Sequence, residues 1–168
     1  AMDLLGRKLG MKKGAVFIDF LNEIKTTIDQ AAENAHLVDL AGRVDKALNR
    51  LSEIALHLSK TAFSKDMKLA LAYAHPFMEI VGDVVMAWML LWRAQVAVPQ
   101  LEKLAGSLEP AAIQSKVAKN KEAAFYDGQL KAAEFYIHAI LPTTIGKMNA
   151  IAMPTPAAID IHERSFGG

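Results

Sequence analysis

The stretch VVMAWMLLW, residues 84–92, is apolar at every position and lies between Asp83 and Arg93. A helix that is apolar on all sides is normally buried at the centre of a protein or at an interface. A membrane-spanning helix needs about 20 apolar residues, and this run has only nine. We therefore expect the stretch to form the central helix of a helical protein, and we do not expect membrane attachment.

Four segments place apolar residues three and four positions apart, which is the spacing of one face of a helix. They are the region after Gly14 and residues 37–63, 66–105 and 110–152. Nothing in the chain alternates polar and apolar residues in the way a strand does. Long amphipathic segments joined by short connections predict an all-α fold, an antiparallel four-helix bundle with kinked long helices.

Three prolines fall inside the predicted helices. Proline has no backbone N–H, and its ring collides with the carbonyl group four residues earlier. We therefore expect a kink near Ala74 because of Pro76, a weakened helix near Val98 because of Pro99, and a kink at Pro142.

The composition excludes several classes of function. The net charge of the 168 residues is only +1, which argues against a nucleic-acid-binding surface. The chain has no cysteine, so disulfides, thiolate catalysis and zinc–thiolate sites are excluded. The first apolar cluster, residues 15–21, is interrupted by Asp19 and does not resemble a signal peptide. These features favour a cytoplasmic protein.

Motifs that carry catalysis are absent from the sequence. It contains no G-x-S-x-G, no HExxH and no glycine-rich phosphate-binding loop. We therefore assign no catalytic and no cofactor-binding residue, and we expect this chain alone to be inactive.

One set of polar residues deserves comparison with a metal site. His75, Glu79 and Asp83 lie four residues apart on an otherwise apolar helix, and Glu134 and His138 have the same spacing on another. Di-iron helical bundles use Glu-x-x-His at a spacing of three, which neither set has. Ion pairs along a polar stripe are the better interpretation, and a metal site at His75, Glu79 and Asp83 is the alternative.

Two further groups have an ordinary and a functional interpretation. Lys116, Lys119 and Lys121 can meet a phosphate-bearing ligand such as coenzyme A, but lysines on a solvated helix face are common. An aromatic set can line a ligand pocket, although at helical spacing such residues more often form the core. This set comprises Trp88, Trp92, Phe125, Tyr126, Phe135 and Tyr136. For packing or an interface we select Phe77, Val84, Trp88, Leu91 and Trp92.

The opening stretch AMDLLGRKL, residues 1–9, resembles a segment that follows the catalytic loop in acyl-CoA dehydrogenases. The pattern in that family is D-L-x-G-R-K-L at the end of a helix. The similarity is greatest to the bacterial branch with an extra C-terminal helical domain, which includes methylmercaptopropionyl-CoA dehydrogenase-like enzymes. The matching residues are Asp3, Leu4, Gly6, Arg7, Lys8 and Leu9.

Two later blocks, residues 75–94 and 121–142, resemble helices of the same C-terminal extension. The first block matches at Pro76, Phe77, Gly82, Val84 and Trp88. The second matches at Ala133, Phe135, Tyr136, Leu141 and Pro142. Glu79 departs from the family, whose members often have a basic residue at this position.

The resemblance implies that this chain is the non-catalytic C-terminal extension of an FAD-dependent acyl-CoA dehydrogenase, a flavoprotein oxidoreductase of fatty acid metabolism. It implies residues 1–12 as the end of the preceding catalytic-domain helix. The helical pattern predicts 13–153 as the bundle, and the prolines and terminal glycines of 154–168 predict an extended tail. The catalytic glutamate and the FAD site would lie upstream, so no cofactor is expected in this chain. The implied partners are the catalytic domain and, in a homo-oligomer, a second subunit. The alternative is a free-standing helical-bundle module that binds a ligand or a metal.

Overall fold

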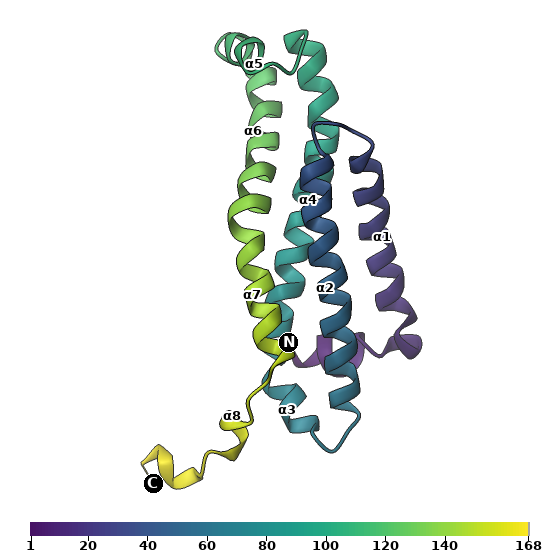
Figure 1. Ribbon diagram of the computed structural model, residues 1–168, viewed down its shortest axis with the longest axis vertical. Helices are drawn as coiled ribbons and strands as arrows, with labels where there is room; N and C mark the ends of the chain where they lie inside the picture. Colours follow the sequence, from purple (N-terminus) through teal and green to yellow (C-terminus); the bar gives the residue numbers. More distant parts are fainter. Residues whose placement is uncertain (168) are drawn as a thin grey trace.

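The computed structural model describes residues 1–167, and these residues form helices and no strand. Four long helical segments run roughly side by side (Figure 1). They are α1 (Ala15–Ala32), α2 (Val38–Ala62), α4 (Ala74–Ala105) and a segment made of α6 (Lys121–Phe135), the π-helical turn η3 (Tyr136–Ile140) and α7 (Leu141–Ala152). The predicted all-α fold is confirmed.

Helix α4, which contains the apolar run, is the central helix of the bundle. It contacts α1, α2, α6 and α7, and its buried side consists of Phe77, Val84, Leu91 and other apolar residues. By length and composition alone α4 could span a membrane, although 39% of its most apolar 18-residue window is buried inside this fold. Burial against four neighbouring helices accounts for much of its apolar sequence.

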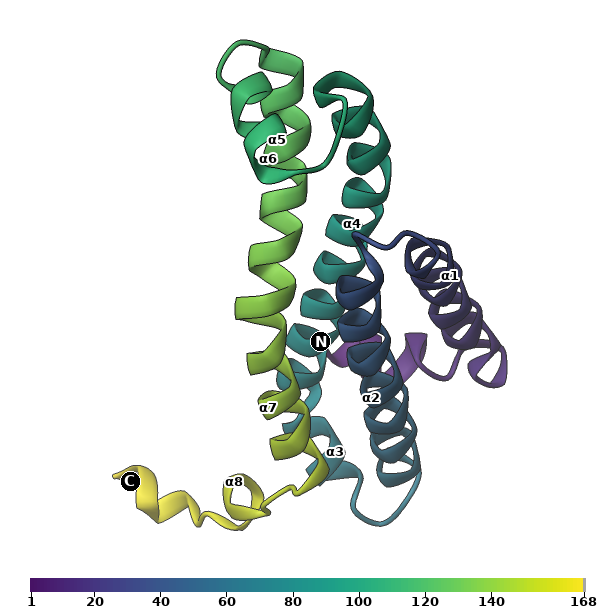
Figure 2. The same cartoon turned by 45° about the horizontal axis from the view of Figure 1, so that its top comes forward.

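Helix α1 lies on the opposite side of the α2–α4 pair from the α6–α7 segment (Figures 1 and 2). Its buried residues Ile24, Ile28 and Ala31 follow the predicted helical spacing. The chain enters α1 through Lys12, Lys13 and Gly14, whose φ angles of 49°, 60° and 89° are all left-handed. These three residues belong to the short 3₁₀ turn η2 (Met11–Gly14), which connects the π-helical turn η1 (Leu4–Lys8) to α1. Leu5 and Leu9 are buried in the bundle core.

The prolines produce three different outcomes. Instead of a kink near Ala74, the chain breaks at Tyr73 between α3 (Met67–Ala72) and α4. Pro76 falls in the first turn of α4, where its missing N–H is not required. Pro99 does not break the helix, since α4 continues through it to Ala105, and the expected weakening near Val98 stays a prediction. Pro99 is exposed, so water can satisfy the carbonyl group that it leaves free.

The predicted single helix over residues 110–152 is also wrong. It is divided into α5 (Pro110–Val117) and α6, because Asn120 begins a new helix by accepting a hydrogen bond from the backbone N–H of Ala123 at 2.9 Å. Near Pro142 the helix widens into η3, whose last bond joins the Leu141 N–H to the Tyr136 carbonyl. A π-helical turn is a common way to accommodate an irregularity within a helix.

The residues after Met153 leave the bundle as an exposed arm (Figure 2). The arm contains two short helical pieces, α8 (Ala157–Asp160) and η4 (Glu163–Phe166). Its one hydrogen bond to the bundle joins the Thr155 N–H to the Tyr73 hydroxyl at 2.9 Å, within the part of the chain that the structure describes. Gly168, the last residue of the expected tail, lies outside the described residues.

Candidate functional site

The polar residues His75, Glu79 and Asp83 of α4 lie close to a lysine of α7. His75 Nε2 lies 3.8 Å from Glu79 Oε1, while Lys147 Nζ lies 4.0 Å from Glu79 and 3.2 Å from Asp83. The ammonium group therefore approaches both carboxylates. Among residues 1–167 no three His, Asp or Glu side chains are grouped closely enough to hold a metal ion. This geometry is that of an ion-pair network joining two helices.

Asp83 is the most tightly held member of this network. Its carboxylate accepts a hydrogen bond from the hydroxyl of Thr144, which is fully buried, at 2.9 Å. Its backbone carbonyl accepts a longer bond from the Tyr136 hydroxyl at 3.4 Å. Burial, assisted by the nearby Asp83, raises the pKa of Tyr136 above its ordinary value. These contacts fix α4 against the end of the π-helical turn.

Sequence analysis did not select Thr144 and Lys147. They lie three residues apart, so they share one side of α7. A threonine at an otherwise apolar helical position was a weak signal that a polar partner faces it. Nothing in the sequence identified that partner as Asp83, because the two residues are far apart in the chain.

The other predicted polar line is divided between two ion pairs. Glu134 pairs with Lys131 at 2.8 Å, and His138 Nε2 lies 3.3 Å from Asp39 Oδ2 on α2. A hydrogen bond from Arg43, with a smaller contribution from His138, holds the pKa of the exposed Asp39 carboxyl below its usual value. Both pairs are largely exposed, so each contributes little to stability.

The lysines considered for phosphate binding lie at the α5–α6 connection. Lys119 and Lys121 are exposed, and Lys116 is half-buried. None of these three lysines forms an ion pair with a residue that the structure describes. This is usual for lysines on a solvated surface.

The five residues selected for packing or an interface have three environments. Phe77, Val84 and Leu91 are completely buried. Trp88 is half-buried, and its indole N–H donates to the Thr27 hydroxyl at 2.8 Å. Its ring also meets Phe20 edge to face, with centroids 6.1 Å apart. Trp92 is 54% exposed, so it does not belong to the core of this chain.

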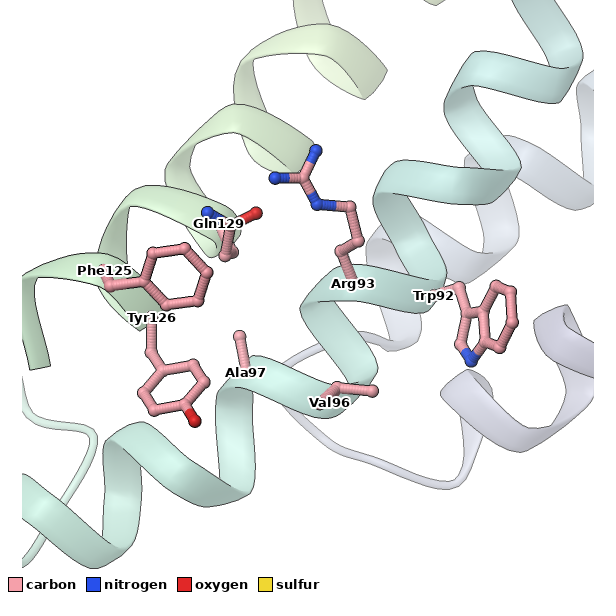
Figure 3. A pocket seen from close by; sticks show the side chains of 7 residues that line it. All are labelled: Trp92, Arg93, Val96, Ala97, Phe125, Tyr126 and Gln129. Carbon is pink, nitrogen blue, oxygen red and sulfur yellow. The ribbon is translucent and has the colours of Figure 1, made fainter. Parts of the chain in front are cut away.

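Trp92 borders a largely apolar pocket of about 360 Å³ between α4 and α6 (Figure 3). The lining residues are Trp92, Arg93, Val96, Ala97, Phe125, Tyr126 and Gln129. Three of the six aromatic residues considered for a ligand pocket line it, whereas Trp88, Phe135 and Tyr136 do not. The lining contains one cation, one phenol (Tyr126) and no acid, histidine or serine, so its chemistry suits binding better than nucleophilic attack.

Comparison with known proteins gives a consistent assignment. A family model described as acetyl-CoA dehydrogenase C-terminal like matches residues 20–162. The chain is 25% identical over 171 residues to the broad-specificity linear acyl-CoA dehydrogenase FadE5 of Mycobacterium tuberculosis. It is 27% identical over 173 residues to a butyryl-CoA dehydrogenase of Syntrophomonas wolfei.

The coverage of these matches is unequal. Each match includes 99% of this chain but only 26% and 25% of the two relatives, so the chain spans about a quarter of their length. The family match covers most of the bundle and includes α2, α4, α6 and α7. The chain therefore belongs to the acetyl-CoA dehydrogenase C-terminal-like family, as its resemblance to the C-terminal extension of acyl-CoA dehydrogenases predicted.

Proposed function

We propose that this chain is a non-catalytic domain of an FAD-dependent acyl-CoA dehydrogenase, and that it acts in packing, assembly or shaping of the acyl-CoA site. The observation that carries the proposal is the unequal coverage, in which nearly the whole chain matches about a quarter of each dehydrogenase. The catalytic glutamate and the flavin would then belong to the remaining part of the parent enzyme.

The pocket between α4 and α6 is poorly suited to FAD. The apolar pocket between α4 and α6 presents one guanidinium group and a largely hydrophobic lining. A dinucleotide needs several donors for its pyrophosphate, usually from a glycine-rich loop at a helix N-terminus. We therefore derive no step of the reaction from this chain and assign it a supporting role.

A structural role agrees with the distribution of apolar side chains. The bundle buries a continuous core, and α4 and α6 still expose Met86, Trp92, Val96, Phe125 and Phe135. Where such side chains adjoin, exposed apolar surface is typical of an interaction site. In the parent enzyme these residues would contact the catalytic part or another subunit, in a cytoplasmic and membrane-free assembly.

The proposal can be tested in native lysate with an antibody against this chain. We expect a band much larger than 18.3 kDa, and we expect the immunoprecipitate to contain flavin and to reduce a dye with acyl-CoA. The purified chain alone should be colourless and inactive. A native band at 18.3 kDa without flavin would contradict the proposal and favour a free-standing module.

A deletion would separate a supporting role from a catalytic one. Parent enzyme that lacks this segment should retain its flavin absorbance but melt at a lower temperature or change its assembly size. Loss of the chemical step, with unchanged stability and assembly, would instead show that this segment contributes directly to the active site.

A further inference from the structure

Helix α4 has an exposed stripe with the spacing of a coiled coil. Its positions alternate between steps of four and three residues, as the contact positions of a heptad do. We call these residues the outer stripe: His75, Glu79, Gly82, Met86, Met89, Arg93, Val96 and Gln100. All are exposed except Met89, which is half-buried. Met86 is 49% exposed and Val96 is 55% exposed, so the apolar part of the stripe has no cover within this chain.

The charges on the outer stripe are separated along the helix. Glu79 lies near the beginning of the stripe, with Asp83 beside it on the same helix, and Arg93 lies past the middle of the stripe. Arg93 makes no hydrogen bond or ion pair with any residue that the structure describes. Fourteen positions separate Glu79 from Arg93, which is about 21 Å along the axis at 1.5 Å per residue. The two charges cannot meet within one copy of α4.

We propose that the outer stripe binds the outer stripe of a second copy, with the two α4 helices antiparallel. In this register Met86 of each copy packs on Met89 of the other, and Arg93 crosses Gly82 of the other. Gly82 has nothing within 4 Å of the position of a Cβ atom, so space is available for the long arginine side chain. The guanidinium group then comes within reach of Glu79 and Asp83 of the second copy. Among the described residues of their own copy, these two carboxylates share only one lysine, Lys147, so a second cation is complementary to them.

The two-fold symmetry of such a dimer preserves this pairing. Rotation about an axis that lies in the interface, perpendicular to α4, brings the α6–α7 side of one copy beside the α6–α7 side of the other. Arg93 faces that side, since it lines the pocket shared with α6. Asp83 faces the same side, since it binds Thr144 and Lys147 of α7. The opposite charges therefore lie on matching sides, and each pair occurs twice.

The chemistry of the stripe suits a specific interface. It is about 38 Å long, and a helix with its side chains is about 11 Å wide. At the helix width of about 11 Å the stripe alone offers about 400 Å² per copy. The flanking side chains of neighbouring helices would have to supply the rest of the roughly 800 Å² that each partner buries in a stable complex. Methionine, arginine and aromatic residues, all present on or beside the stripe, are enriched in interfaces.

Sedimentation equilibrium of the purified 168-residue chain tests the proposal directly. We expect a dimer, and we expect Met86→Asp to weaken it by about 100-fold or more, because the substitution buries two carboxylates at the centre. Leu56→Asp on α2 is the matched control, since Leu56 is 57% exposed but lies outside the stripe. Equal unfolding midpoints would show that both variants are folded.

Charge reversal tests the antiparallel register. Arg93→Glu and Glu79→Arg should each weaken the dimer by about 10-fold, because each creates like-charge contacts. The double variant should recover part of the lost affinity and bind more tightly than either single variant, since the pair at positions 79 and 93 is again of opposite charge while Asp83 is unchanged. If the double variant bound no more tightly than the single variants, the proposed register would be contradicted.

The absence of native cysteine allows a second test of the register. Met86→Cys places the two thiols close to the symmetry axis, so a short bis-maleimide should crosslink the dimer efficiently. Val96→Cys places them about 25 Å apart along the axis and should not be crosslinked. Crosslinking of both variants would refute an antiparallel pair.

A chain that remains monomeric at all concentrations would overturn the proposal of a second copy. It would leave the stripe available to the rest of the parent enzyme and would not affect the proposed function, which does not depend on this dimer.

Discussion

The two faces of α4 both carry large apolar side chains, but these have different surroundings. The inner face places Phe77, Val84 and Leu91 completely inside the bundle. The outer face presents Met86, Trp92 and Val96 to solvent. A helix that is apolar on all sides therefore indicates burial in the final assembly, and only part of that burial is achieved within this chain.

The sharpest test of this difference compares two aromatic truncations. Phe77→Ala should reduce the free energy of unfolding by about 3–5 kcal/mol, since it opens a cavity in the core. Trp92→Ala should change the free energy of unfolding by less than about 0.5 kcal/mol, since Trp92 lies on the surface of the isolated chain. Urea unfolding followed by circular dichroism measures both. Equal losses would show that Trp92 is buried and would remove the distinction between the faces.

Trp88 lies at the border between the faces and should have an intermediate effect. Trp88→Phe retains most of the apolar contact but removes the donor to Thr27, at a cost of about 1–2 kcal/mol. In a double-mutant cycle, Thr27→Val should add little once Trp88 has been replaced. Fully additive losses would mean that the indole–hydroxyl bond does not contribute to stability.

The polar edge of α4 can be tested through Thr144. Thr144→Val keeps the shape of the buried side chain but removes a donor to the Asp83 carboxylate, so we expect a loss of about 1 kcal/mol. Thr143→Val is a suitable control, because Thr143 is exposed and donates only to the Ile140 carbonyl within its own turn. If both variants lost a similar free energy of unfolding, the hydrogen bond from Thr144 to Asp83 would not contribute specifically to stability.

The smallest expected effect is a pH dependence at Tyr136. Its raised pKa means that the folded state holds the phenolic proton more tightly than the unfolded state does. This contribution is fully present below about pH 10, the ordinary pKa of tyrosine, and is lost as the pH rises through the folded-state pKa. The free energy of unfolding, measured from about pH 9 to pH 11, should fall more steeply for the wild type than for Tyr136→Phe. If the free energies of unfolding of the two proteins followed parallel curves against pH, the raised pKa of Tyr136 would be contradicted.

The sequence predicted the central helix because its signal is local and continuous. Nine apolar residues between Asp83 and Arg93 exclude a solvated helix whatever the rest of the fold. The proline rule was less reliable, since Pro99 is tolerated in an exposed turn while buried Val98 and Leu101 hold the helix in place. The break before α6 depends on the cap formed by Asn120, a short signal that a long apolar pattern obscured.

The contacts around the candidate site were harder to predict. The spacing of His75, Glu79 and Asp83 placed them on one side of a helix, which the structure retains. It did not reveal that Lys147 approaches from α7, because this contact joins segments more than sixty residues apart. Likewise, hydrophobicity alone did not distinguish the buried Leu91 from the neighbouring exposed Trp92.

The π-helical turn Tyr136–Ile140 has a consequence for the permitted length of the chain. A single-residue deletion in a regular α-helix rotates everything after it by about 100° and would turn a buried face away from its neighbours. A wider turn already contains one residue more than an α-helical turn needs. Removal of the exposed Ala139 should therefore be absorbed locally, leaving Ala133 and Met148 facing the core. Homologous chains one residue shorter at this point can retain the same bundle, so the turn is a site where evolution can change length without changing the fold.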